Sequence, residues 1–278
     1  MNINLVLGLL IGVWVVGDGV IARSSKPILF FDLHALLIVG LGTVAAALIA
    51  SPPGRLKAIA KFIVTGALFR RERSKSYLIR TLISAHAHIL KAGSSRVAVS
   101  EDIHPFLKEG IDLIREGHLN AEELREVLEL RVGHFRRSYG EDAKSIAAIA
   151  KFPPAFGLLG AASGMISLMA NLGSGGKESI GPAMATAMVA TFWGVGVANF
   201  VLLPLSDYAN RLGIEDVELR NLMVQGLLLI HQRENPVVLK EKLMSFLRLN
   251  ERDEVEIHFS AQFPTPARET GIHLRSGS

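Results

Sequence analysis

Two stretches decide the fold of this chain: FPPAFGLLGAASGMISLMANL at residues 152–172 and SIGPAMATAMVATFWGVGVANFVLLPLS at residues 179–206. They hold 21 and 28 residues, and neither contains Asp, Glu, Lys or Arg. An α-helix rises about 1.5 Å per residue, so about 20 apolar residues cross the hydrocarbon core of a bilayer. Both stretches are therefore predicted to be transmembrane helices, joined by a short polar loop.

Small and hydroxylic side chains are frequent in this pair of stretches. Such residues let helix backbones approach closely and offer hydroxyl groups to a buried path. In the second stretch they recur at helical spacing on one face, at Ala183, Ala187, Thr191, Gly194 and Ala198. We expect this face to take part in close helix packing and assembly.

Two further apolar segments lie at the N-terminus. The first covers residues 1–22 and is interrupted only by Asp18, and the second covers residues 29–50, with Asp32 near its start. Hydrophobic residues make up 49% of the 278 residues, which is high for a soluble chain. The sequence thus predicts an all-α, polytopic membrane protein with four transmembrane helices and a helical cytoplasmic domain.

The basic residues predict the orientation. Of the 30 Lys and Arg, 17 lie in residues 51–150, one is Lys151 and nine lie in residues 207–278. The remaining three, Arg23, Lys26 and Lys177, fall in the other two loops. Because basic loops stay in the cytoplasm, both termini and the large loop are predicted to be cytoplasmic. The net charge of +4 then reflects topology and contact with anionic lipid, not nucleic-acid binding.

The cytoplasmic segments show helical periodicity, and Asn120 with Glu123 forms a capping-box pattern at one helix start. Pro and Gly with mixed charges favour a mobile tail at the C-terminus. The expected parts are the first two transmembrane helices (1–50), a cytoplasmic helical domain (51–145), the hairpin (146–206), a cytoplasmic helical extension (207–250) and the mobile tail (251–278).

No motif of a soluble enzyme is present. The sequence lacks a phosphate-binding G-x-x-x-x-G-K-S/T, a zinc-binding H-E-x-x-H and a G-x-S-x-G elbow. It has no cysteine, which excludes disulfides and thiolate metal sites. His86 and His88 lack the spacing of a helical metal pair. We therefore expect neither enzymatic activity nor a cofactor or metal.

Four motifs of the hairpin carry a family resemblance: Pro154-Ala-Phe-Gly-Leu-Leu-Gly160, Ile180-Gly-Pro-Ala-Met-Ala185, Ala190-Thr-Phe-Trp-Gly194 and Pro204-Leu-Ser-Asp207. They resemble the third and fourth spans of the flagellar stator A subunits, the MotA/PomA family, within the wider MotA/TolQ/ExbB family. The resemblance runs in order over about residues 1–248. It implies a subunit that converts ion flow into torque on the flagellar rotor.

The resemblance also implies partners and a place in the cell. Stator A subunits form a homo-pentamer around two copies of a single-span B subunit, which supplies the membrane aspartate that carries the ion. The residues agree, because the third and fourth spans contain no carboxylate and a charge isolated in hydrocarbon is costly. A rotor protein of the switch complex, similar to FliG, and the bilayer of the bacterial inner membrane complete the expected surroundings.

Residues of the ion path follow from the same resemblance. Thr191, Ala187 and Gly194 are expected on the partner-facing side. Ala161 stands where sodium-driven members have a threonine; because alanine offers no oxygen to replace the water of sodium, protons are the favoured ion. Asp32 lies near the outer end of the second span, and two roles stay open for it: a place at the entrance, or structural hydrogen bonding.

Pro154 and Pro204 match prolines that are functional in the family and allow helices to bend, although both also suit a helix boundary. Lys91 and Glu101 occupy charged family positions of the rotor-contact loop. Leu90 and Ala98 replace an expected arginine and glutamate, and Arg96 is a candidate substitute for the lost positive charge. For Lys91, Glu101 and Arg96 the alternative is a solvated helix face.

Three other functions remain to be weighed. A TolQ/ExbB-type energiser of an envelope process is the runner-up, and the loop of about 95 residues between the second and third spans argues against it. A solute transporter would show broken helices or paired charges in two repeated halves, which this sequence lacks. A structural scaffold without ion flow needs a flux assay to exclude.

Overall fold

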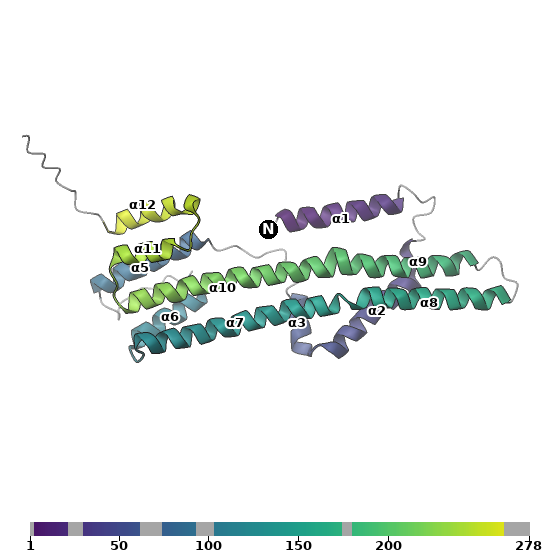
Figure 1. Ribbon diagram of the computed structural model, residues 1–278, viewed down its shortest axis with the longest axis horizontal. Helices are drawn as coiled ribbons and strands as arrows, with labels where there is room; N and C mark the ends of the chain where they lie inside the picture. Colours follow the sequence, from purple (N-terminus) through teal and green to yellow (C-terminus); the bar gives the residue numbers. More distant parts are fainter. Residues whose placement is uncertain (1–2, 22–29, 62–73, 93–102, 174–179, 264–278) are drawn as a thin grey trace, which may run out of the picture. The chain divides into compact units, whose positions relative to one another are not determined.

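The computed structural model describes residues 3–21, 30–61, 74–92, 103–173 and 180–263, and every regular element in these ranges is a helix (Figure 1). This confirms the predicted all-α fold. The chain divides into two compact units: residues 1–71 with 135–215, and residues 72–134 with 216–278. Helices α7 (Ala121–Ile149) and α10 (Leu203–His231) contribute residues to both units.

The first unit is built around a helical hairpin. Helix α8 (Phe152–Gly173) packs along α9 (Ile180–Val197), and α2 (Leu33–Ala50) contacts both. Ala35 and Val39 of α2 pack against Val189 and Ala190 of α9 in a small apolar cluster. Helix α1 (Ile3–Ile21) touches a five-residue π-turn, η5 (Ala198–Leu202), which follows α9.

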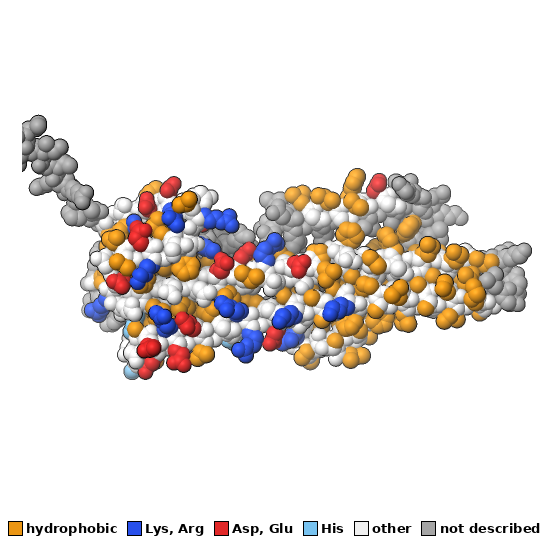
Figure 2. Space-filling model, in the orientation of Figure 1, with side chains coloured by type: hydrophobic (Ala, Val, Ile, Leu, Met, Phe, Trp, Pro, Cys, Tyr) orange, Lys and Arg blue, Asp and Glu red, His pale blue; other side chains and the backbone are white. Residues whose placement is uncertain are grey.

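Hydropathy and length agree with a membrane protein. Three helical stretches are long and apolar enough to cross a bilayer: Leu33–Ala50, Ala121–Ala170 and Ile180–His231. Figure 2 shows hydrophobic side chains over α8 and α9, whereas charged side chains gather over α7 and α10. Helix α1 contains only a shorter apolar stretch, Leu10–Gly19, so the count of four spans stays a prediction.

The boundary between α7 and α8 has a local cause. Ala150 and Lys151 form a turn, and the Lys151 N–H donates to Ala148 O at 3.3 Å, three residues back instead of four. Pro153 and Pro154 follow, and neither has an N–H to continue the helical ladder. The prolines thus end α7 and start α8, because a missing donor is tolerated in the first turn of a helix.

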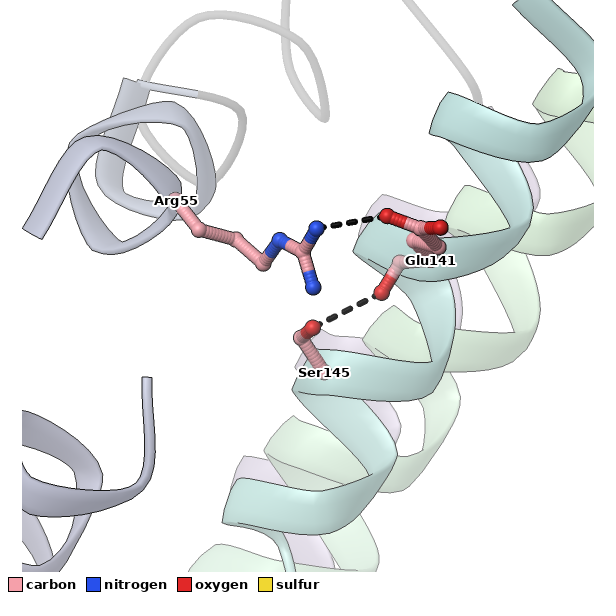
Figure 3. A network of polar contacts seen from close by, with 3 residues as sticks. All are labelled: Arg55, Glu141 and Ser145. Atoms are coloured by element: carbon pink, nitrogen blue, oxygen red, sulfur yellow. Dashed lines mark hydrogen bonds and ion pairs between the residues drawn. The ribbon is translucent and has the colours of Figure 1, made fainter. Parts of the chain in front are cut away.

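A polar contact joins α3 (Pro53–Lys61) to α7 within the first unit. Arg55 Nη2 lies 2.5 Å from Glu141 Oε2, and the Ser145 hydroxyl donates to the Glu141 carbonyl at 2.7 Å (Figure 3). The Ser206 hydroxyl of α10 also donates to the Ala143 carbonyl at 2.9 Å, and this pair is buried. These bonds link α3 and the start of α10 to α7.

The second unit contains α5 (Lys75–Ala92), α6 (Pro105–Glu116), α11 (Pro236–Met244), a 3₁₀ turn η6 (Leu249–Glu251) and α12 (Arg252–Gln262). The predicted capping box is confirmed at the start of α7. The Asn120 N–H donates to Glu123 Oε2 at 2.8 Å, and the Glu123 N–H donates to Asn120 Oδ1 at 2.9 Å. Asn235 caps α11 in a similar way, with Pro236 at its first position.

The region expected to be a mobile tail begins with an ordered helix. Helix α12 contacts α5 and α11, and its Val255 and Phe259 are buried. Glu254 pairs with Arg80 of α5 at 3.6 Å, and His258 Nε2 lies 3.0 Å from the Ser84 hydroxyl. Residues 251–262 therefore belong to the packed unit, because two apolar residues four apart give the helix a buried face. Residues 264–278 lie outside the described ranges.

Candidate functional site

Helices α8 and α9 pack so closely that several of their glycines have no room for even a Cβ atom. A Cβ atom on Gly157 would lie 2.9 Å from Ala190 O, and one on Gly164 would lie 2.8 Å from Ala187 Cβ. A Cβ atom on Gly194 would lie 2.6 Å from Pro153 O. Glycine and alanine thus allow backbone contact between the helices, as expected for helices in a membrane.

The structure corrects the direction expected for the small-residue face of α9. We expected Ala187 and Gly194 to face a central partner, but both are buried in the contact with α8. Ala198 is also buried. Small residues suit any close helix contact, so their spacing identified a packing face without identifying its neighbour.

Thr191 and Ala161 lie at the edge of this contact. Both are half-buried, and the Thr191 hydroxyl donates to the Ala187 carbonyl at 3.3 Å within its own helix. Their role in an ion path stays a prediction. On the exposed surface of α8 lie the hydroxyls of Ser163 and Ser167, which are four residues apart and thus share a face.

Asp32 holds α2 and α9 together at one end of the hairpin. Its Oδ1 accepts hydrogen bonds from the backbone N–H groups of His34 at 2.8 Å and Ala35 at 3.2 Å, so Asp32 is the N-cap of α2. Its Oδ2 accepts a short hydrogen bond from the Thr186 hydroxyl of α9. Of the two roles left open for Asp32, structural hydrogen bonding is confirmed, and a place at the entrance stays a prediction.

Aromatic residues strengthen the same end of the hairpin. Trp193 Nε1 donates to the Phe30 carbonyl at 2.7 Å, just before α2 begins. The Trp193 ring centroid lies 5.8 Å from that of Phe31 and 5.6 Å from that of Phe192. The contacts of Thr186 and Trp193 could not be predicted from the sequence, because only the fold brings residues 30–32 beside α9.

The two family-matched prolines lie at helix boundaries. Pro154 is in the first turn of α8, and Pro204 is the second residue of α10, directly after the π-turn. In the π-turn the Leu203 N–H donates to Ala198 O, five residues back. π-turns occur often at functional sites. No sequence pattern predicted this π-turn, although Asn199 inside it is the one Asn or Gln in residues 179–206.

The predicted rotor-contact residues are placed only in part. Lys91 belongs to the last turn of α5, whereas Arg96 and Glu101 lie outside the described residues. Leu90, where an arginine was expected, is 42% exposed. Among the described residues, no cluster of three or more His, Asp or Glu could hold a metal ion.

Comparison with known proteins places these features in context. Residues 98–220 match the family model described as the MotA/TolQ/ExbB proton channel family. Motility protein A of Borreliella burgdorferi is 27% identical over 92% of this chain and 97% of its own length. Chemotaxis protein PomA of Vibrio alginolyticus is 25% identical over 91% of this chain and 98% of its own length.

Solved structures share the fold. A chain of the flagellar MotAB stator complex from Bacillus subtilis superposes with a TM-score of 0.80 at 22% identity, over 90% of this chain and 97% of that chain. A chain of MotAB from C. jejuni gives a TM-score of 0.76 at 21% identity.

The fold and the hairpin define a class: a helical membrane protein in which two charge-free helices are held at backbone contact. Within that class, residues 98–220 match the MotA/TolQ/ExbB proton channel family, and the chain is similar over about nine-tenths of its length to Motility protein A and PomA.

Proposed function

We propose that this chain is the A-type subunit of a bacterial flagellar stator and, with a single-span partner of the MotB type, converts ion flow into torque. The observation that carries the proposal is the near full-length match to motility proteins and to MotAB stator chains, over about nine-tenths of this chain. The relatives and solved structures reported above are motility proteins and MotAB stator chains, so the TolQ/ExbB alternative is not favoured.

The chemistry of the hairpin supports a partner that supplies the acid. Residues 152–172 and 179–206 offer hydroxyls and amides but no carboxylate. An ion that crosses this region therefore needs a carboxylate from another chain, since an unpaired charge is costly in hydrocarbon. Neutralising that carboxylate would change which part of a surrounding ring of A subunits it prefers to contact. Ion binding would thereby shift an equilibrium between two arrangements of the ring and the central partner helices. A homo-pentamer around two partner helices supplies such a ring.

Location follows from the charge distribution. The basic residues of α3, α5 and α7 and of the segments after α10 favour a cytoplasmic side for these parts. In a bacterium that side faces inward from the inner membrane, where a rotor protein of the FliG type can reach the chain. Both termini are then cytoplasmic.

Restoring motility tests this function. The chain is expressed with the single-span protein from the neighbouring reading frame in a strain that lacks its own stators, and swimming is measured. We expect swimming only when both proteins are present. If swimming is absent while an envelope process dependent on TolQ/ExbB is restored, the chain is an energiser and the stator assignment is wrong.

Charge reversal at Lys91 tests the contact with the rotor. Lys91→Glu should lower torque while membrane insertion and partner binding persist, because electrostatic contacts set how surfaces engage. A matching reversal on the rotor protein should restore part of the torque. Lys75→Glu is the control: Lys75 belongs to the same helix but is paired with Glu218 at 2.9 Å. Unchanged torque in Lys91→Glu would assign Lys91 to a solvated helix face.

A further inference from the structure

The π-turn leaves one backbone carbonyl without its usual donor. In an α-helix the Leu203 N–H would donate to Asn199 O, four residues back. Here it donates to Ala198 O instead. The next residue, Pro204, has no N–H and cannot donate to the Asn199 carbonyl from five residues away. The turn and the proline together free this oxygen within the fourth apolar stretch.

The side chain of the same residue presents a second oxygen. Asn199 is exposed, and its Nδ2 group donates to Val195 O at 2.9 Å. Among the described residues, no donor reaches its Oδ1. The side-chain nitrogen is thus used within the helix while the oxygen is not. One of the two N–H groups of Nδ2 remains available to donate to water, so Asn199 presents two acceptors and one donor at one place.

Two acceptors of this kind are not suited to lipid. An amide oxygen without a hydrogen bond is costly in hydrocarbon, and lipid chains offer no donor. Oxygen atoms of interrupted membrane helices typically face water or bind cations. Packing against an apolar partner helix would leave both oxygens unpaired, so water or a hydrated cation is the better match.

We propose that the Asn199 side-chain oxygen and the Asn199 backbone carbonyl form an oxygen-lined station that binds the conducted monovalent cation together with its water. This rests on the proposed function and extends it. Asn199 follows Thr191 by eight residues, which is about 12 Å along a helix, in the direction of Pro204. The station therefore lies between the expected acid-binding region and the cytoplasmic end of the path, where the ion regains water.

Thiol labelling tests whether water reaches this position. The chain contains no cysteine, so an introduced thiol is the one reactive group in it. Asn199→Cys and Val201→Cys are compared in membranes that contain the complete complex, with a charged, membrane-impermeant methanethiosulfonate reagent. Val201 is the control because it belongs to the same π-turn and is 45% exposed, but it is apolar.

We expect the thiol of Asn199→Cys to react at least about tenfold faster, since the reactive thiolate forms in water and not in hydrocarbon. Equal, slow reaction of both thiols would show a dry position and overturn the proposal.

Ion flux in proteoliposomes with the partner gives a second measurement. Asn199→Ser keeps a side-chain oxygen, whereas Asn199→Leu has none. We expect Asn199→Leu to lower flux by about tenfold, the effect of roughly one lost hydrogen bond, and Asn199→Ser to keep most of it. Co-purification with the partner checks that both variants assemble.

Equal flux in the two variants would refute the station. Both measurements are made without flagella, so a failure to restore swimming would count against the stator role and not against this inference.

Discussion

Asp32 is a single residue that caps one helix and ties it to another. Asp32→Ala removes the acceptor for two N–H groups and for the Thr186 hydroxyl, and loss of an N-cap costs about 1 kcal/mol. Asparagine caps helices nearly as well, so Asp32→Asn should keep most of this stability. We expect a lower melting temperature for the purified Asp32→Ala complex than for Asp32→Asn. Equal melting of the two variants would mean that the cap contributes little.

His86 gives the second unit a dependence on pH. Its side chain is fully buried, Nε2 lies 2.8 Å from the Glu234 carbonyl, and Nδ1 has no hydrogen-bond partner among the described residues. Burial lowers the pKa of His86 below the ordinary value of 6.5, because the charged ring loses its water. The unfolded chain therefore binds a proton more readily than the folded chain, so folding stability falls as pH falls below 6.5.

This predicts a difference between two histidine variants. His86→Gln can still donate to Glu234 O but does not titrate, so its melting temperature should fall less than that of the unchanged protein as pH is lowered from neutral to about 5. His88→Gln, on an exposed neighbour in α5, should behave like the unchanged protein. The idea fails if all three proteins lose stability in parallel.

At the scale of elements, the contact between α8 and α9 is set by glycine. Gly194→Ala places a Cβ atom 2.6 Å from Pro153 O, which is backbone and cannot move aside cheaply. Such overpacking typically costs about 1–3 kcal/mol. Gly196→Ala is a matched control in the same helix, because a Cβ atom there meets nothing within 4 Å in this chain.

We expect thermal melting to show a destabilised Gly194→Ala protein and a Gly196→Ala protein close to normal. The larger change Gly194→Leu, like Ala187→Leu, should prevent assembly or flux altogether. Normal swimming by both leucine variants would contradict the observed packing.

Local signals in the sequence predicted helix ends better than helix neighbours. Asn120 and Glu123 are hydrogen-bonding partners three residues apart, so the start of α7 could be predicted from their spacing. The π-turn could not, because its hydrogen bonds depend on how the helix fits its surroundings. Helix α12 was missed because its two buried residues, Val255 and Phe259, give only a weak signal within a charged segment.

For the whole molecule, the sequence predicts which ion drives the protein. Ala161 offers no oxygen where a sodium site would need one, so the protein should be driven by protons. We expect swimming speed to stay unchanged when sodium is replaced by potassium at fixed pH and membrane potential, and to fall when an uncoupler is added. Speed that collapses without sodium would refute proton coupling.

The membrane class and the expected orientation could be predicted from where apolar and charged residues lie along the sequence. Charge-free stretches and the distribution of Lys and Arg were enough for the membrane class and for an expected orientation. The candidate site was harder to predict from the sequence, because Asp32 and Thr186 are 154 residues apart and meet only in the fold. The direction in which α9 presents its small residues likewise depends on the neighbouring helix and not on the spacing itself.

The extra residue in the π-turn also sets the rotational phase of everything that follows it. Each residue advances an α-helix by about 100°, so a turn with one additional residue rotates the next segment by that angle. Leu205, Tyr208 and Leu212 form their buried cluster, and Ser206 reaches the Ala143 carbonyl, in the phase that the longer turn provides. Deleting one residue from Ala198–Leu202 would make a regular helix and turn this cluster away from its neighbours. A single-residue deletion there would therefore be far more harmful than a substitution.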